Sequence, residues 1–217
     1  MASVILLPDK KYSVGKIIGV GQNYAQHAAE MGGSGKNPPV LFLKPPTAIL
    51  AEGQPIKLPG YSNNVQHEVE LALLIGRTGK DIAAGDWRQY LAGAGIALDL
   101  TLRDLQRLAK DRGEPWSVSK GFDGACPGSA FTPLDQIKDL NNLQIELEVN
   151  HLPRQSASTA GMIYPVERLI AYISGYFTLE AGDIILTGTP AGVGKIVSGD
   201  LLQARIEGLG EIQFNVA

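Results

Sequence analysis

Three carboxylates in two short segments have the types and spacing of a divalent-metal site. Glu68 and Glu70 stand two positions apart in HEVELALLIG, residues 67–76, which has the pattern of a strand. Because successive strand side chains point to opposite faces, the two glutamates share one face at the start of a run that becomes wholly apolar. Asp99 directly follows a second apolar run, 94–98. Carboxylates at so apolar a position repel each other and lose hydration, so solvent, arginines, a shared proton or a metal ion must offset this cost.

The donor types narrow the choice of ion. No thiolates or clustered histidines accompany the three acids, and hard oxygen donors suit Mg²⁺, Mn²⁺ or Ca²⁺ rather than Zn²⁺. Three carboxylates also leave coordination positions open for water and a chelating substrate, as catalysis requires. The alternative for the glutamate pair is a solvated strand end that binds nothing.

Two further polar residues follow Asp99 in ALDLTLRDLQRLAKDRG, residues 97–113. Thr101 and Asp104 have the spacing of a capping box, which predicts that a helix opens here. Arg103 and Gln106 are three positions apart, so on that helix they share a face close to Asp99. The alternative for this pair is a solvated helix face.

A histidine and a glutamate stand three positions apart in a short predicted helix, 24–31. His27 and Glu30 would lie on one face of it, and a histidine oriented by a carboxylate can act as a general base near neutral pH. The alternative is an incidental surface contact. Because so short a helix is marginal alone and a glycine-rich loop follows it, residues 23–36 are predicted to form a flexible lid.

The elements that must position these side chains follow from the hydrophobic pattern. Short apolar runs broken by Gly, Pro and Asp predict strands at 16–20, 40–43, 67–75, 94–98, 143–149, 183–187, 200–206 and 211–216. The predicted helices are 24–31, 101–111 and 165–175. Many strands, few helices and no regular alternation predict an α+β fold with a mixed or mostly antiparallel sheet, in a single domain over residues 1–217.

Composition excludes several classes of protein. Hydrophobic residues make up 44% and charged residues 19%, an ordinary globular mixture. The formal net charge of −3 offers no basic stripe for nucleic acid or an anionic membrane. No apolar run approaches the ~20 residues of a membrane span, and the N-terminus lacks the basic start of a signal peptide. Cys126 is the single cysteine, so no internal disulfide can form, and we expect a soluble cytoplasmic protein.

Three glycine-rich segments resemble phosphate-binding loops, but each lacks a required residue. GVGQNY has Tyr24 in place of the third glycine of a dinucleotide fingerprint. In GRTGK and GTPAGVGK, Leu74 and Thr189 stand where a P-loop needs its first glycine. All three are predicted to be glycine turns, so nucleotide binding is not expected.

Six segments together resemble the fumarylacetoacetate hydrolase family, in the family's order and over roughly residues 14–205. They are VGQNYAQHAAEMG, PVLFLKPPTAI, HEVELALLIG, ALDLTLRDLQ, PWSVSKGFDGACPGS and TLEAGDIILTGTPAGVG. The likeness is greatest to the short branch of acylpyruvate hydrolases and oxaloacetate decarboxylases. This resemblance implies a mixed β-sandwich roll resembling the C-terminal domain of that family, Mg²⁺ or Mn²⁺ as cofactor, and a homodimer.

The resemblance also assigns roles to individual residues. The positions that match the family's metal ligands are Glu68, Glu70 and Asp99. The positions that match its catalytic residues are His27, Glu30 and Lys120, the first two as the water-activating pair on the lid. The positions that match its substrate-binding residues are Arg103, Gln106 and Thr189. Gln22 departs from the pattern, because many relatives carry arginine there, and this removes a possible anion contact.

The function implied is cleavage of a C–C bond in an acylpyruvate, which yields pyruvate and a carboxylic acid, with possible decarboxylation of oxaloacetate. In each case the substrate is a small 2-oxo acid. One alternative is an oxaloacetate keto–enol tautomerase, or an isomerase or hydratase of unsaturated oxo-dicarboxylates. Another is a non-catalytic module that holds a structural Ca²⁺, but such a module needs neither a base nor an active-site lysine.

Overall fold

The computed structural model describes residues 2–30 and 38–217, with the backbone alone for residues 28–30. Its largest sheet has eight strands in the order β4-β3-β14-β7-β8-β10-β5, and β11 pairs with β8 beside β10. These strands are β3 (Ile17–Gly21), β4 (Val40–Lys44), β5 (Ile49–Ala51), β7 (Val69–Ile75), β8 (Leu91–Leu98), β10 (Cys126–Gly128), β11 (Thr132–Pro133) and β14 (Ile184–Leu186). The pairs β3–β14 and β5–β10 are parallel and the others antiparallel, which confirms the predicted mixed sheet.

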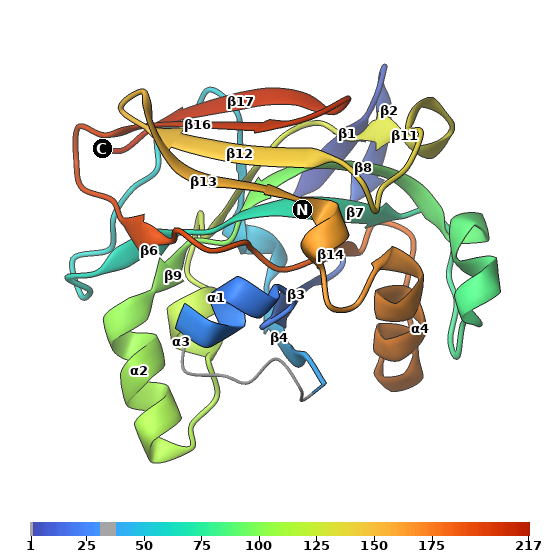
Figure 1. The fold of residues 1–217 in the computed structure, drawn as a ribbon, viewed down its shortest axis with the longest axis horizontal. Helices are drawn as coiled ribbons and strands as arrows, with labels where there is room; N and C mark the ends of the chain where they lie inside the picture. Colours follow the sequence, from blue (N-terminus) through green and yellow to red (C-terminus); the bar gives the residue numbers. More distant parts are fainter. Residues whose placement is uncertain (1, 31–37) are drawn as a thin grey trace.

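A second, antiparallel sheet covers one face of the first, in the order β13-β12-β16-β17 (Figure 1). Its strands are β12 (Gln144–Val149), β13 (Leu152–Ser158), β16 (Leu201–Ile206) and β17 (Gly210–Asn215). Buried and more accessible residues alternate along β12 and β16, so each has one inward face. All of β7 is buried instead, as expected of a strand covered on both sides. The core therefore lies between the two sheets, where β12 contacts β7 and β16 and β17 contact β8.

The smaller elements are a two-stranded and a three-stranded sheet and several short helices. The small sheets contain β1 (Ser3–Leu6) with β2 (Lys10–Ser13), and β15 (Gly194–Lys195) with β6 (Val65–His67) and β9 (Thr101–Leu102). The α-helices are α1 (Ala25–Glu30), α2 (Arg103–Arg112), α3 (Ser117–Lys120) and α4 (Val166–Tyr176). The 3₁₀ helices are η1 (Pro46–Ala48), η2 (Ala84–Gln89), η3 (Leu134–Gln136) and η4 (Thr159–Gly161).

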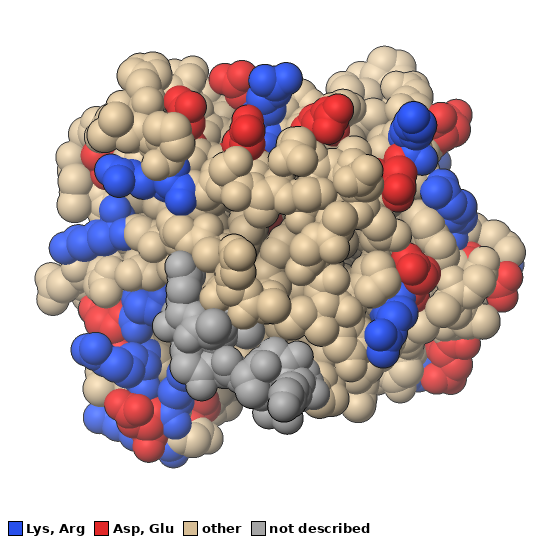
Figure 2. Space-filling model, viewed as in Figure 1, with Lys and Arg blue, Asp and Glu red and all other residues tan. Residues whose placement is uncertain are grey.

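Three helices gather at one end of the molecule. In Figure 1, α1, α2 and α3 lie together at the lower left, beneath the junction of β6 and β7, while α4 lies at the opposite side. Charged side chains of both signs crowd the surface over α2, whereas the centre of the same face is largely uncharged (Figure 2). Within the described chain, every helix is too short or too polar to cross a membrane.

The capping box predicted at Thr101 is wrong. Helix α2 begins at Arg103 after Leu102, and no side chain caps its first turn. Thr101 is instead a residue of β9 that pairs with Gln66, and its hydroxyl donates to the backbone carbonyl of Asp99. Sequence spacing alone did not reveal this, because tertiary strand pairing takes the residue that would have capped the helix.

Candidate active site

Strand register brings the three carboxylates together. In the antiparallel pair β7–β8, Val69 lies opposite Leu98, and one step further the backbone N–H of Asp99 donates to the carbonyl of Glu68 at 2.8 Å. Residues directly opposite each other in such a pair point to the same face, and Glu70 lies two residues along on that face. One carboxylate oxygen from each of the three residues lies within 4.8 Å of the other two.

The three acids fit a divalent cation by number, type and burial. Each is almost completely buried, with at most 4% of its surface exposed. Asp99 Oδ1 has an ion-pair contact with Lys44 Nζ at 2.7 Å, yet no described group donates a hydrogen bond to it. Lys44 thus supplies charge to this buried oxygen but no hydrogen bond, because its hydrogens go to backbone carbonyls, and a metal ion could be the missing partner. Three anionic oxygen donors and no sulfur donor suit Mg²⁺ or Mn²⁺.

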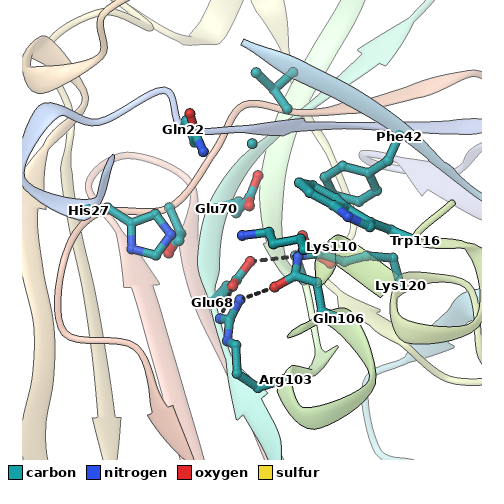
Figure 3. A pocket seen from close by; sticks show the side chains of 14 residues that line it. Gln22, His27, Phe42, Glu68, Glu70, Arg103, Gln106, Lys110, Trp116 and Lys120 are labelled. Carbon is teal, nitrogen blue, oxygen red and sulfur yellow. Dashed lines mark hydrogen bonds and ion pairs between the residues drawn. The ribbon is translucent and has the colours of Figure 1, made fainter. Parts of the chain in front are cut away.

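Two cations from α2 and α3 neutralise part of this acidic cluster. Lys120 Nζ donates to Glu68 Oε2 at 2.8 Å, Asp99 Oδ2 at 2.5 Å and Thr101 Oγ1 at 2.7 Å, which uses all three of its hydrogens. Arg103 forms a close ion pair with Glu68, and it also donates to Gln106 Oε1 at 2.7 Å. In Figure 3, Arg103 reaches Glu68 from below and Lys120 lies to its right, and they contact different oxygens of its carboxylate.

The pKa values show which acid is least compensated. Burial raises the pKa of Glu70, and the charges of Asp99 and Glu68 raise it further, well above its usual range. Burial alone would also raise the pKa of Glu68, but Lys120 and Arg103 outweigh it and hold that pKa low. Burial opposes charge on Lys120, yet Asp99 and Glu68 raise its pKa overall, so this ammonium stays protonated. Glu70 is therefore the carboxylate that most needs a further positive charge.

Lys44 is a residue of the site that received no role from the sequence. Only 1% of it is exposed, and its ammonium donates to the backbone carbonyls of Leu100, Lys120 and Ala125 at 3.3, 2.5 and 2.9 Å. These contacts join the segment after β8 to the end of α3. Lys44 thus holds Asp99 and Lys120 in their relative positions. The apolar run VLFL that ends at Lys44 was the available signal, because a lysine in an apolar strand is rarely buried without a partner.

Gln155 of β13 is a second residue that the sequence did not single out. Its Oε1 accepts from the backbone N–H of Val69 at 3.1 Å and lies 3.0 Å from His67 Nδ1. Its Nε2 donates to Thr189 Oγ1 at 2.7 Å and to the carbonyl of Pro190 at 2.9 Å. The side chain therefore ties the strand of the two glutamates to the loop after β14. No sequence signal marked it, because β13 is mostly polar.

The loop after β14 completes the wall near Glu70. The backbone N–H of Gly188 donates to Glu70 Oε2 at 2.5 Å, and Gly188 has a φ of 97°. A Cβ at this position would lie 2.8 Å from the Cβ of Asn23 and 3.1 Å from the carbonyl oxygen of Val20. Thr189, which was predicted to bind the substrate, lines the pocket, but its hydroxyl already donates to the carbonyl of Val69 at 2.9 Å.

The pocket in front of the acids brings together nearly all of the predicted site residues. It is lined by Val20, Gly21, Gln22, His27, Phe42, Glu68, Glu70, Asp99, Arg103, Gln106, Lys110, Trp116, Lys120 and Thr189. His27 is buried on the wall formed by α1, across the pocket from Lys120 in Figure 3. The side chain of Glu30 and part of the predicted lid over 23–36 lie outside the described residues.

Comparisons with known proteins agree with this geometry. The family described as fumarylacetoacetate (FAA) hydrolase C-terminal matches residues 16–217. The oxaloacetate tautomerase YcgM of Escherichia coli is 48% identical, over 91% of this chain and 90% of its own. The mitochondrial oxaloacetate decarboxylase of Dictyostelium discoideum is 46% identical, over 93% of each chain.

A solved structure resembles the whole chain. It is a fumarylpyruvate hydrolase from Pseudomonas aeruginosa in complex with Mn²⁺ and pyruvate, and it superposes with a TM-score of 0.96 at 34% identity. The match covers 100% of this chain and 95% of that one. The predicted β-sandwich roll is confirmed by this likeness together with the family match.

Proposed function

The chain belongs to the fumarylacetoacetate hydrolase family, and on that basis we propose that it is a divalent-metal-dependent enzyme that interconverts the keto and enol forms of oxaloacetate and also decarboxylates it. The observation that carries the proposal is the buried Glu68–Glu70–Asp99 group with the Lys120 ammonium against two of its members. The names of the curated relatives favour oxaloacetate over an acylpyruvate as the main substrate.

The ion proposed for the three carboxylates is Mg²⁺ or Mn²⁺. When bound there, such an ion supplies positive charge that polarises a substrate oxygen and offsets negative charge developing on it. Arg103 and Gln106 lie on the adjacent face of α2, where a guanidinium and an amide can hold the carboxylate of a 2-oxo acid. The substrate would thus be bound beside the cation by its 2-oxo acid end.

The remaining residues move or hold protons. In tautomerisation a proton leaves C3 of oxaloacetate and a proton reaches the C2 oxygen. Lys120 is protonated and is fixed beside Glu68 and Asp99, so its positive charge can offset negative charge that grows on this oxygen. His27, on the opposite wall, is the residue suited to carry the C3 proton near neutral pH. In decarboxylation the C3–C4 bond breaks and releases CO₂, and C3 of the resulting enolate then takes up a proton.

The proposal is tested by following the ultraviolet absorbance of enol-oxaloacetate with metal-free, Mg²⁺-loaded and Mn²⁺-loaded protein. We expect loss of activity with EDTA and recovery with either ion. Lys120→Met should lower kcat/KM by about 10²-fold or more, since the positive charge beside a developing oxyanion is lost. Lys57→Met, which removes a charge from an exposed lysine, is the control. No rate above buffer for the wild type, or full activity of a folded Lys120→Met protein, would refute the proposal.

Hydrolysis of acylpyruvates is the second candidate function. It is favoured by the likeness to the fumarylpyruvate hydrolase structure and by the position of His27 on the pocket wall, where an imidazole can deprotonate an attacking water. Water then adds to the distal carbonyl, and the C–C bond breaks to leave pyruvate and a carboxylic acid.

One variant separates the two functions. For His27→Ala we expect acetylpyruvate hydrolysis to fall by about 10²–10⁴-fold, the usual effect of losing a general base. Decarboxylation of oxaloacetate requires no attacking water, so it should fall less. Equal losses in kcat/KM on both substrates would mean that His27 does not activate water.

A further inference from the structure

Lys110 lines the same pocket as the acids, but among the described residues no ion pair joins it to any of them. It lies on α2 at positions i+4 from Gln106 and i+7 from Arg103, so all three residues share one face of the helix. That face is turned to the pocket, and in Figure 3 the Lys110 side chain reaches toward its centre. The aromatic ring of Trp116 lies 5.2 Å from Lys110 Nζ and steadies the ammonium there.

The other cations of the pocket wall are already engaged. Lys120 donates its three hydrogens to Glu68, Asp99 and Thr101. Arg103 is held by Glu68, and it also donates to Gln66 and Gln106. Among the side chains that the structure describes, no carboxylate forms an ion pair with Lys110. Among the lysines and arginines that the structure describes on the pocket wall, Lys110 is therefore the one whose charge is not already paired with a carboxylate.

Its surroundings favour binding of an anion. Burial lowers the pKa of Lys110, and repulsion from Arg103 and Lys120 lowers it further, whereas attraction to Glu68 raises it. A bound carboxylate would relieve this repulsion. On the opposite wall Gln22 offers an uncharged amide, and His27 is already proposed to carry the C3 proton.

We propose that Lys110 binds the distal carboxylate of a 2-oxo dicarboxylate and thereby selects dicarboxylates over 2-oxo acids that lack this group. The inference rests on the proposed function for the position of the 2-oxo acid end, which lies at the three acids and Arg103. A small 2-oxo dicarboxylate carries its second carboxylate on the same molecule, so that group must also be met inside this pocket. Lys110 is the residue that can meet it, because its long side chain reaches in from the rim.

The test compares substrates that differ in the distal carboxylate. Wild type, Lys110→Gln, Lys110→Arg and Arg112→Gln are assayed with oxaloacetate and fumarylpyruvate, which have this group, and with acetylpyruvate, which lacks it. Arg112 is the matched control, because it is an exposed cation on the same helix that does not line the pocket. We expect Lys110→Gln to raise KM for the dicarboxylates about 10- to 100-fold, the usual loss for a charged hydrogen bond. The KM of Lys110→Gln for acetylpyruvate should change less than threefold, as should every KM of Arg112→Gln. Lys110→Arg should recover most of the loss.

A binding measurement keeps this inference separate from the proposed function. Calorimetric titration of the Mn²⁺-loaded protein with 2-oxoglutarate and with pyruvate requires no turnover. A selective loss of 2-oxoglutarate affinity in Lys110→Gln supports the assignment even if the wild type turns over none of the three substrates, an outcome that would refute the proposed function alone. Equal losses for the dicarboxylate and the monocarboxylate, or no loss for either, would overturn the role of Lys110.

Discussion

Lys44 is a buried cation whose contacts hold the active-site backbone in place. It donates to three backbone carbonyls and lies 2.7 Å from Asp99, so the removal of its charge leaves four acceptors without their partner. Breaking a buried ion pair by removing one member typically costs about 3–5 kcal/mol. We predict a loss of this size in the free energy of unfolding for Lys44→Met, measured by urea denaturation.

The matched control for this prediction is Lys57→Met, at an exposed lysine that does not line the pocket. A surface substitution of this kind usually changes stability by no more than about 0.5 kcal/mol. If Lys44→Met were as stable as Lys57→Met, Lys44 would contribute nothing to the arrangement of Asp99 and α3.

At the scale of elements, the turn after β14 links backbone conformation to the chemistry of the site. Gly188 has a φ of 97° and lies tight against Asn23 and Val20, whereas Gly199 has a φ of 93° and open space where a Cβ would lie. We predict that Gly199→Ala lowers the free energy of unfolding by about 1–2 kcal/mol because of the backbone conformation alone. Gly188→Ala should cost more, because crowding adds to the same strain.

Activity distinguishes the two glycines further. Gly188→Ala should also impair turnover of oxaloacetate, since the backbone N–H of Gly188 donates to Glu70, while Gly199→Ala should leave turnover intact. Thermal unfolding and kcat/KM for both variants provide the comparison. Equal effects of the two substitutions would show that neither crowding nor the bond to Glu70 matters at Gly188.

Elements with a strong hydrophobic pattern could be predicted from the sequence, and elements fixed by tertiary contacts could not. The run Val69–Ile75 is apolar on both faces, so its burial between two layers could be read directly. By contrast, β13 (Leu152–Ser158) is largely polar, and it is a strand because β12 pairs with it. Helix α3 has only four residues, too few for a periodic signal.

The residues of the candidate site also divide into those that the sequence could reveal and those that it could not. Glu68, Glu70 and Asp99 could be found because acids at strand ends stand out against apolar runs, and strand register then brings them together. Lys44 and Gln155 act through backbone groups distant in the sequence, so no local spacing reveals them. Lys110 could have been found by extending the helical spacing of Arg103 and Gln106 by one more turn.

At the scale of the whole molecule, the family resemblance predicts a homodimer, which we retain as a proposal. The structure leaves β4 at an edge of the large sheet, with Leu43 46% exposed and Val40 38% exposed. Edge strands with exposed apolar residues are surfaces that a partner can cover. Light scattering after gel filtration should give a mass twice the 23.1 kDa of one chain. A mass of one chain across the concentration range would contradict the proposal.

The account as a whole depends on a divalent cation bound by the three buried acids. Calorimetric titration of Mn²⁺ into metal-free protein tests this directly, without any assumption about the substrate. We predict one ion per chain for the wild type and at least about 10²-fold weaker binding for Glu70→Gln, because one of three anionic donors is lost. The exposed Glu114→Gln variant should bind as the wild type does. Unchanged Mn²⁺ affinity in a folded Glu70→Gln protein, or no binding by the wild type, would contradict the account.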